Sequence, residues 1–198
     1  SANQAAGFSV VKYTGSTGNT SFGTGLTSEA EFIIFKRYTN AQNWFVFLKI
    51  NNVWHYIEGL NTTSAAINYS ASMSSTSTTV NLPSFNEFNQ DPNSSYLAYC
   101  FSKVGSYTGN QSLNTANQIN FGFTPGFVLI KNTTNSGSQW MLFDSARTNG
   151  MALYANSSSA AVDYTTDLLL SSQGLEFKST NINVNQSGAT YIYLAIKE

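Results

Sequence analysis

The sequence predicts an all-β protein, an antiparallel β-sandwich built from two pseudo-repeated halves of about 95 residues each. Three observations predict it: the composition, two hairpins with unbroken apolar strands, and an internal repeat. Aromatic residues make up 14% of the 198 residues and charged residues only 10%, whereas charged residues supply about 25% of an average soluble domain. Aromatic and β-branched residues between Asn, Ser and Gly turns are typical of strands.

The two hairpins occupy residues 32–47 and 127–143. Each consists of two continuous apolar runs joined by a polar turn, and Trp44 and Trp140 open the second run. A strand with one face in water would alternate apolar and polar residues, whereas a continuous run indicates that both faces are covered. We therefore expect both hairpins to be central in the sandwich, with their Trp residues in matching places.

The internal repeat keeps a spacing of 94 to 96 residues along the chain. It relates Tyr13-Thr14-Gly15 to Tyr107-Thr108-Gly109, the two hairpins, residues 61–69 to 156–164, and residues 96–98 to 191–193. This period is too long for a solenoid unit and indicates a duplicated β module. No Pro-rich or Gly/Ser-rich linker separates the halves. We therefore expect one pseudo-symmetric β unit over residues 1–198, with half one at 1–103 and half two at 104–198.

Some stretches fit the repeat poorly. Residues 70–79 are rich in Ser, Thr and Ala, and residues 82–92 lack a core pattern, so we expect both to be surface loops. Cys100 lies in an apolar strand pattern and is expected to be a small buried apolar residue. A single Cys forms no internal disulfide.

Several classes of function are disfavoured by composition. The net charge is −1 and Lys and Arg are scattered, so we expect no nucleic-acid binding. No apolar run reaches the roughly 20 residues of a spanning helix, so we expect no membrane insertion. One His and one Cys cannot form a zinc site, and Asp163 and Asp167 lack the rest of a calcium loop. We expect no metal and no cofactor.

Catalytic patterns are also missing. His55, the only histidine, has no nucleophile motif beside it. Asp144 and Arg147 are expected to pair locally at a turn, in a structural role. Paired carboxylates for glycoside hydrolysis need not be adjacent in sequence, so a glycan depolymerase stays an alternative to the non-enzymatic function that we expect.

The candidate ligand-binding residues are Asn52, Trp54, His55 and Tyr56. Half two has no comparable aromatic residues at 147–151, so the shared scaffold does not require them. A Trp or Tyr ring can pack on a sugar while a neighbouring Asn donates hydrogen bonds to hydroxyl groups. The competing interpretation is that Trp54 and Tyr56 lie on one strand face and fill a core or a subunit interface.

Several motifs together resemble a known module. They are Gly-Phe-Ser-Val-Val-Lys-Tyr-Thr-Gly at 7–15, Phe-Ile-Ile-Phe-Lys at 32–36, Leu-Asn-Thr-Thr at 60–63, Tyr-Leu-Ala-Tyr-Cys-Phe at 96–101, Gly-Ser-Tyr-Thr-Gly-Asn at 105–110, Gly-Phe-Thr-Pro-Gly-Phe-Val-Leu-Ile-Lys at 122–131 and Asp-Ser-Ala-Arg at 144–147. On these motifs nearly the whole chain resembles the duplicated module of tail-fibre and other virion surface proteins of tailed phages, notably phages of marine bacteria and cyanobacteria. One departure is that half one lacks a counterpart of Pro125 before its hairpin.

The resemblance implies a non-enzymatic structural protein of the virion, on the tail or capsid surface and made in the host cytoplasm. It implies a tail fibre or receptor-binding tip that recognises the host surface, with a glycan as the expected receptor. A capsid decoration or head-fibre protein is the alternative. The implied partners are other virion proteins and further copies of the chain, as a homotrimer. The resemblance transfers no catalytic or binding residues. Ser1 is compatible with removal of an initiator Met or with a cut end of a longer chain.

Overall fold

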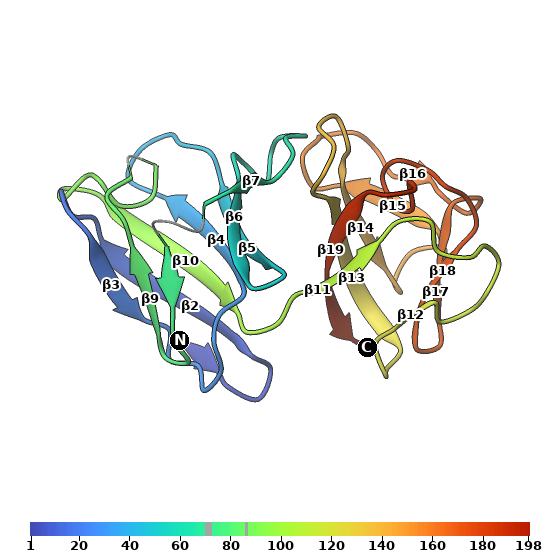
Figure 1. Ribbon diagram of the computed structural model, residues 1–198, viewed down its shortest axis with the longest axis horizontal. Coiled ribbons are helices and arrows are strands. Elements are labelled where there is room, and N and C mark those ends of the chain that lie inside the picture. The colour runs from blue at the N-terminus through green and yellow to red at the C-terminus, as the bar shows by residue number, and fades with distance from the viewer. Residues whose placement is uncertain (70–72, 86) are drawn as a thin grey trace. The chain divides into compact units, whose positions relative to one another are not determined.

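The computed structural model describes residues 1–69, 73–85 and 87–198 and confirms an all-β protein (Figure 1). Its strands pair antiparallel in several sheets, consistent with a β-sandwich. Within the described ranges no helix is long and apolar enough to cross a bilayer.

The chain divides into two compact units. Unit 1 consists of Ser1–Leu60 and Ala66–Val104, and unit 2 of Asn61–Ala65 and Gly105–Glu198. The short segment Asn61–Ala65 belongs to unit 2, where the Thr63 carbonyl accepts hydrogen bonds from the Gly137 amide at 2.9 Å and from Lys131 Nζ at 3.4 Å. The main boundary thus lies one residue beyond the predicted end of half one. That the halves pack as one unit stays a prediction.

Unit 1 contains a seven-stranded sheet and a three-stranded sheet. In spatial order the large sheet has β1 (Ala2–Asn3), β2 (Phe8–Thr14), β10 (Ser95–Phe101), β4 (Phe32–Arg37), β5 (Phe45–Ile50), β6 (Val53–Ile57) and β7 (Ile67–Asn68), and the small sheet has β3 (Thr20–Gly23), β9 (Thr79–Leu82) and β8 (Ser74–Ser75). One core cluster joins residues of both sheets, with Phe35 and Phe47 from the large sheet and Val80 from the small one. Unit 1 is therefore built in two layers.

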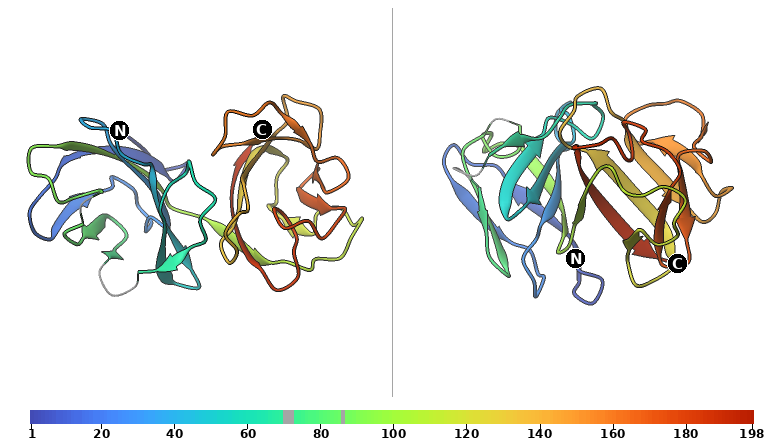
Figure 2. Two further views of the ribbon diagram at one scale, coloured as in Figure 1. Left: turned by 90° about the horizontal axis from the view of Figure 1, so that it is seen from above. Right: turned by 45° about the vertical axis from the view of Figure 1, so that its right-hand side comes forward.

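Unit 2 contains a six-stranded sheet and a three-stranded sheet. The large sheet has β11 (Gly105–Thr108), β19 (Thr190–Lys197), β13 (Pro125–Asn132), β14 (Trp140–Asp144), β15 (Met151–Tyr154) and β16 (Val162–Asp163), and the small sheet has β12 (Ile119–Asn120), β18 (Gly174–Phe177) and β17 (Leu168–Ser171). Its own core cluster includes Phe143, Tyr164 and Phe177. Seen from above, the ribbons of each unit surround a central space (Figure 2). The side chains of that unit's own core cluster fill it.

The strand order is the same in both units once β1 is set aside. The first strand pairs with the last, which pairs with the hairpin that continues to the opposite edge. Register also agrees: Ile33 faces Phe47 across the first hairpin, and Val128 faces Phe143 across the second. These agreements concern pairing, and a superposition of residues 8–101 on 104–196 stays a prediction.

The hairpins are buried on both faces, as their unbroken apolar runs predict. In unit 1, Phe35 and Phe47 point into the core, and Phe32 and Leu48 on the opposite face are fully buried as well. The two Trp residues have equivalent backbone bonds, since Leu60 N donates to Trp44 O at 2.7 Å and Ala155 N to Trp140 O at 2.9 Å. Their side chains differ, because Trp140 is fully buried and Trp44 is 37% exposed.

The expectation of surface loops at 70–79 and 82–92 is only partly confirmed: the described residues of 83–92 form a loop, but neither stretch lies wholly at the surface and the first contains strand residues. Met73 and Phe88 are buried core residues, and β8 lies inside the first stretch. Residues 70–72 and 86 of these stretches lie outside the described residues. The sequence pattern failed here because strands of two to four residues are too short to show alternation. Cys100 is fully buried as expected, and burial raises the pKa of its thiol to about 12.

In each unit a pair of stacked tyrosines attaches one loop to the large sheet. This loop leads from the small sheet back to the last strand. In unit 1, Tyr13 stacks on Tyr96 with ring centroids 5.3 Å apart, and its hydroxyl donates to the Phe88 carbonyl. In unit 2, Tyr107 stacks on Tyr191 at 4.9 Å, and its hydroxyl donates to the Val184 carbonyl at 2.6 Å. Both hydroxyls therefore satisfy a carbonyl of the loop that leads from the small sheet back to the last strand.

A glycine and a buried asparagine complete this arrangement, which we call the tyrosine lock. A Cβ on Gly109 would lie 1.8 Å from the Gln186 carbonyl oxygen, so only glycine allows the loop to approach. Asn185 is fully buried; its Nδ2 donates to Gln111 O at 3.1 Å and to Ser179 O at 3.0 Å. Unit 1 has Gly15 and Asn89 in the same roles.

We predict that Tyr107→Phe destabilises unit 2 by about 1–3 kcal/mol, because the Val184 carbonyl loses its donor. The stacked ring is retained, so the loss isolates the hydroxyl. Urea denaturation measures it, with Tyr38→Phe as a control at a tyrosine that is 45% exposed. Equal unfolding free energies of Tyr107→Phe and wild type would contradict the role of the lock.

Lys131, on β13, is a fully buried cation. Its Nζ donates to Ser138 O at 2.7 Å and to Ser138 Oγ at 2.8 Å. None of the ion pairs found among the described residues includes it. Burial lowers the pKa of Lys131 from 10.5 to about 8. The folded protein thus releases this proton more readily than the unfolded chain.

The stability should therefore depend on pH through Lys131. Between about pH 8 and 10.5 the unfolded state binds more protons than the folded state. The free energy of unfolding therefore increases as the pH rises through this range. Lys131→Met removes this contribution. The free energy of unfolding of the wild type, relative to that of the variant, should therefore increase between about pH 7 and pH 9.5. Urea denaturation across this range measures it, with the exposed Lys103→Met as the charge control. A difference that does not change with pH would contradict the prediction.

Candidate functional site

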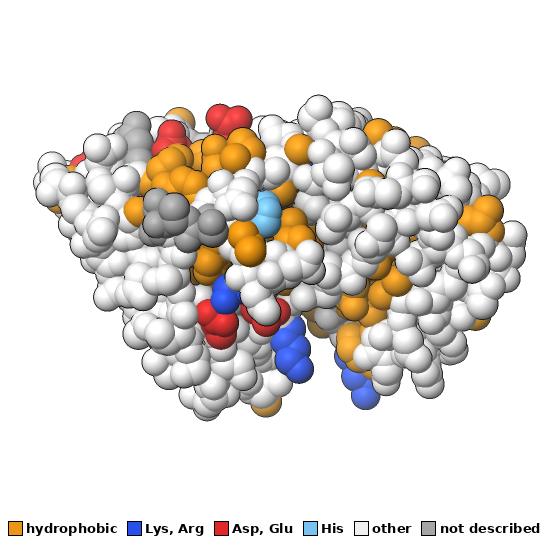
Figure 3. Space-filling view, viewed as in Figure 1, with side chains coloured by type: hydrophobic (Ala, Val, Ile, Leu, Met, Phe, Trp, Pro, Cys, Tyr) orange, Lys and Arg blue, Asp and Glu red, His pale blue; other side chains and the backbone are white. Residues whose placement is uncertain are grey.

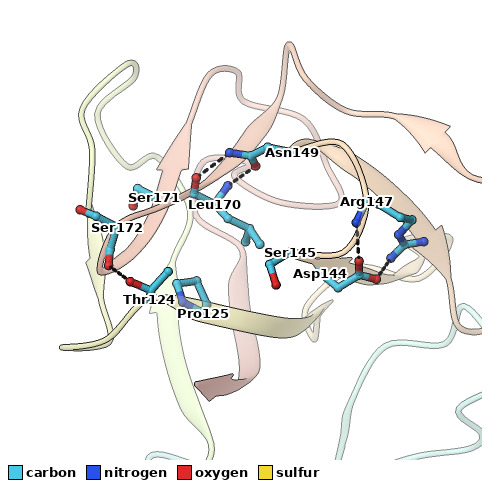
Figure 4. A pocket seen from close by; sticks show the side chains of 9 residues that line it. All are labelled: Thr124, Pro125, Asp144, Ser145, Arg147, Asn149, Leu170, Ser171 and Ser172. Carbon is cyan, nitrogen blue, oxygen red and sulfur yellow. Dashed lines mark hydrogen bonds and ion pairs between the residues drawn. The ribbon is translucent and has the colours of Figure 1, made fainter. Parts of the chain in front are cut away.

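A pocket of about 330 Å³ opens in unit 2 where three chain segments meet (Figure 4). The segments are the start of β13, the end of β14 with its following turn, and the end of β17 with its following turn. The lining residues are Thr124, Pro125, Asp144, Ser145, Arg147, Asn149, Leu170, Ser171 and Ser172. The pocket therefore lies where strands of the large and small sheets of unit 2 end, partly on the turns that follow them.

Asp144 organises the turn that follows β14. Its Oδ1 accepts hydrogen bonds from the backbone amides of Ala146 at 3.1 Å and Arg147 at 3.0 Å. Its Oδ2 forms an ion pair with Arg147 Nη2, which also donates to the Leu142 carbonyl at 3.3 Å. The predicted pair of Asp144 and Arg147 is thus confirmed. Both side chains remain about one-fifth exposed, at 22% and 23%, so the pair borders the pocket.

Further hydrogen bonds hold the opposite wall. Asn149 Nδ2 donates to Leu170 O and Asn149 Oδ1 accepts from Leu170 N, each at 2.8 Å. Thr124 Oγ1 donates to Ser172 O at 2.7 Å. Figure 4 shows these bonds crossing between the loops. The walls are therefore fixed by bonds within the chain, and a ligand would not have to order them.

The pocket keeps unused polar capacity beside an apolar surface. The hydroxyl groups of Ser145 and Ser172 make no hydrogen bond with a described residue. Ser145 and the side chain of Leu170 point into the space between the segments in Figure 4, and the ring of Pro125 lies close by. Hydroxyls, one carboxylate and two apolar side chains in a concave site are suited to binding a small polar molecule.

The corresponding place in unit 1 is filled. Ser145 N donates to Gly126 O at 3.0 Å, and in unit 1 Lys49 N donates to Glu31 O at 2.8 Å, so Lys49 has the backbone position of Ser145. By the same spacing along the strands, Glu29 corresponds to Thr124. Unit 1 thus has two long charged side chains where unit 2 has two short hydroxyl side chains.

The side chains of Lys49 and Glu29 form an ion pair with each other at this position. Lys49 Nζ lies 2.6 Å from Glu29 Oε1 and 5.4 Å from the ring centroid of Trp54, and Ser75 Oγ donates to Glu29. At the matching places unit 2 has only the short side chains of Thr124 and Ser145, both of which line the pocket. A comparison of the two halves could have pointed to the pocket, because the residue types at these places differ. Without the strand register, however, the sequence does not indicate which residues lie together.

The expected aromatic site is mostly core. Trp54 is 4% exposed and belongs to the core cluster of unit 1, against which Tyr56 also packs. The structure thus agrees with the competing interpretation for these two residues, and the ring of Trp54 is not available for stacking on a sugar. Asn52 is an exposed turn residue with φ of 63°, and half-buried His55 has Nδ1 2.9 Å from Val53 O. A binding role for these two stays a prediction.

The surface has few charged groups on the face shown in Figure 3, and uncharged polar side chains and backbone cover most of it. The described residues contain no group of three or more His, Cys, Asp or Glu that could hold a metal ion. Trp44, which the hairpin pattern predicts to be central, is 37% exposed; its ring centroid lies 6.1 Å from that of Tyr99 and 5.4 Å from Lys36 Nζ.

These features define an all-β protein of two compact units, one of which carries a small polar pocket. The chain belongs to the family described as a domain of unknown function, DUF7483, whose model matches residues 1–198. No curated protein and no solved structure matches it.

Proposed function

We propose that this protein is a non-enzymatic component of a phage virion surface, a tail fibre or receptor-binding tip in which the pocket of unit 2 binds a glycan of the host surface. The resemblance of the sequence motifs to phage tail-fibre modules supports the virion location. The pocket supports the binding role, since hydroxyl and carboxylate groups beside small apolar surfaces are suited to sugar recognition.

The observation that carries the proposal is the difference between the two units. Strand pairing places the Lys49–Glu29 ion pair of unit 1 where unit 2 has Thr124 and Ser145 beside its pocket. The core does not require an open pocket there, because unit 1 folds with the position filled. Asp144, the carboxylate in the pocket, is held by Arg147 and by the turn amides, and this arrangement suits a positioned hydrogen-bond acceptor rather than a catalytic base.

We predict that closing the pocket weakens glycan binding. The double variant Thr124→Glu/Ser145→Lys copies the ion pair of unit 1 into unit 2, so it should fill the pocket and reduce binding on a host-glycan array and adsorption to host cells at least about tenfold, or 1.4 kcal/mol. The thermal unfolding temperature should change little, because the same pair is accommodated in unit 1.

The matched control is Ser158→Lys/Thr180→Glu, which introduces the same side chains at exposed positions outside the pocket lining. It should bind as wild type does. Equal binding by the pocket variant and the control would contradict the proposed site. New reducing ends released from host polysaccharide by the wild-type protein would instead indicate a glycan depolymerase.

We further predict a homotrimer in solution. Only 10% of the residues are charged, and large apolar side chains such as Ile67 and Ile196 are 48% and 51% exposed, so little charge repulsion opposes association. Multi-angle light scattering at micromolar concentrations should give three times the 21.5 kDa chain mass. A monomer throughout that range would contradict the prediction.

A further inference from the structure

The charges in the unit 2 pocket cancel. Asp144 and Arg147 are the only charged residues among those that line it, and they form an ion pair with each other. Arg147 Nε and Nη1 have no hydrogen-bond partner among the described residues, but both atoms are buried, so a ligand carboxylate would lie near Asp144 without an accessible cation to bind it. A ligand ammonium would meet a carboxylate whose charge Arg147 already neutralises. Charged ligands would thus lose hydration without a full ionic partner in return.

The remaining hydrogen-bond capacity suits hydroxyl groups. Asp144 Oδ2 accepts from Arg147 Nη2, and a carboxylate oxygen has a second lone pair for another donor. Thr124 Oγ1 uses its proton on Ser172 O and can still accept. Ser145 Oγ can donate and accept. A ligand that both donates and accepts at neighbouring atoms matches this set, as adjacent hydroxyl groups of a sugar do.

Apolar groups complete the match. Pro125 and Leu170 line the same pocket, and the C–H face of a pyranose ring is apolar and can pack on such side chains. Of the other polar lining groups, Asn149 is bonded to both backbone atoms of Leu170 and Ser171 Oγ donates to Asn117 Oδ1 at 2.7 Å, whereas the Ser172 hydroxyl remains able to donate and accept. Selectivity then rests on a few groups around the Asp144–Arg147 pair.

We propose that the unit 2 pocket selects an uncharged saccharide unit, one whose hydroxyl groups donate to Asp144 and exchange hydrogen bonds with Ser145 and Thr124, while Arg147 positions and neutralises Asp144. This inference rests on the proposed glycan binding and adds the ligand class. In it, Arg147 is a positioning residue whose charge excludes cationic sugars, and Asp144 excludes anionic ones.

The test compares three methyl glycosides that differ at one group: a neutral hexose, the matching uronic acid and the matching 2-amino sugar. Binding is measured by NMR titration of the full chain at about pH 6, where the uronic acid is ionised and the amino sugar is mostly protonated. Galactose-type and glucose-type sets are both used. We expect the neutral sugar to bind about tenfold more tightly than either charged one in at least one set.

Two variants change the pocket charge without changing its size greatly. Asp144→Asn leaves Arg147 uncompensated and should shift the preference toward the uronic acid about tenfold. Arg147→Met leaves Asp144 uncompensated and should shift it toward the amino sugar. The control Glu176→Gln makes the same charge change outside the pocket lining, at a residue paired with Lys178, and should leave the ranking unchanged. Circular dichroism and the unfolding temperature verify that each variant is folded.

The outcomes separate the two proposals. Preference of the wild type for a charged sugar, lost on closing the pocket with Thr124→Glu/Ser145→Lys, would overturn the ligand class and leave glycan binding intact. An unchanged ranking in both folded charge variants would overturn the role of the Asp144–Arg147 pair. Failure of every sugar class and of host glycans to bind would overturn both proposals.

Discussion

Each unit depends on fixing the loop that returns from the small sheet against the large sheet. The small sheets have strands of only two to four residues, so their ladders supply few hydrogen bonds. The tyrosine lock provides what the ladders lack: in unit 2 the Tyr107 hydroxyl binds a loop carbonyl, Asn185 satisfies buried backbone groups, and Gly109 allows close approach. Burial raises the pKa of Tyr107 well above its ordinary value, which keeps its donor proton in place.

Because the layers are fixed in this way, the residues at the strand ends and in the following turns can differ between the two units without changing the core. Unit 1 uses that freedom to place the Lys49–Glu29 pair beside Trp54, and unit 2 to leave a pocket beside Asp144. An ion pair at a partly exposed position contributes little to stability, so filling or opening this position costs the fold little. Variation in ligand binding is expected at such a position.

Much of the fold could be predicted from sequence. The continuous runs of the two hairpins indicated central strands, and Cys100 was expected in the core; the structure confirms both. The local pair of Asp144 and Arg147 was also foreseen, because a turn brings residues three apart together. Strands β8 and β9 were harder to predict, since such short elements form only where a partner strand and buried side chains such as Val80 and Leu82 hold them.

The sequence by itself determined the all-β class, the two hairpins and the turn around Asp144, because each depends on residues close together in the chain. Only the tertiary structure decided which aromatic side chains are buried: Trp44 and Trp140 have the same local pattern, yet one is 37% exposed and the other fully buried. It also showed that Trp54 is core and that Thr124, Ser145 and Leu170 share a pocket. Burial and pocket formation depend on what packs from distant strands, and that information is not contained in any single stretch of sequence.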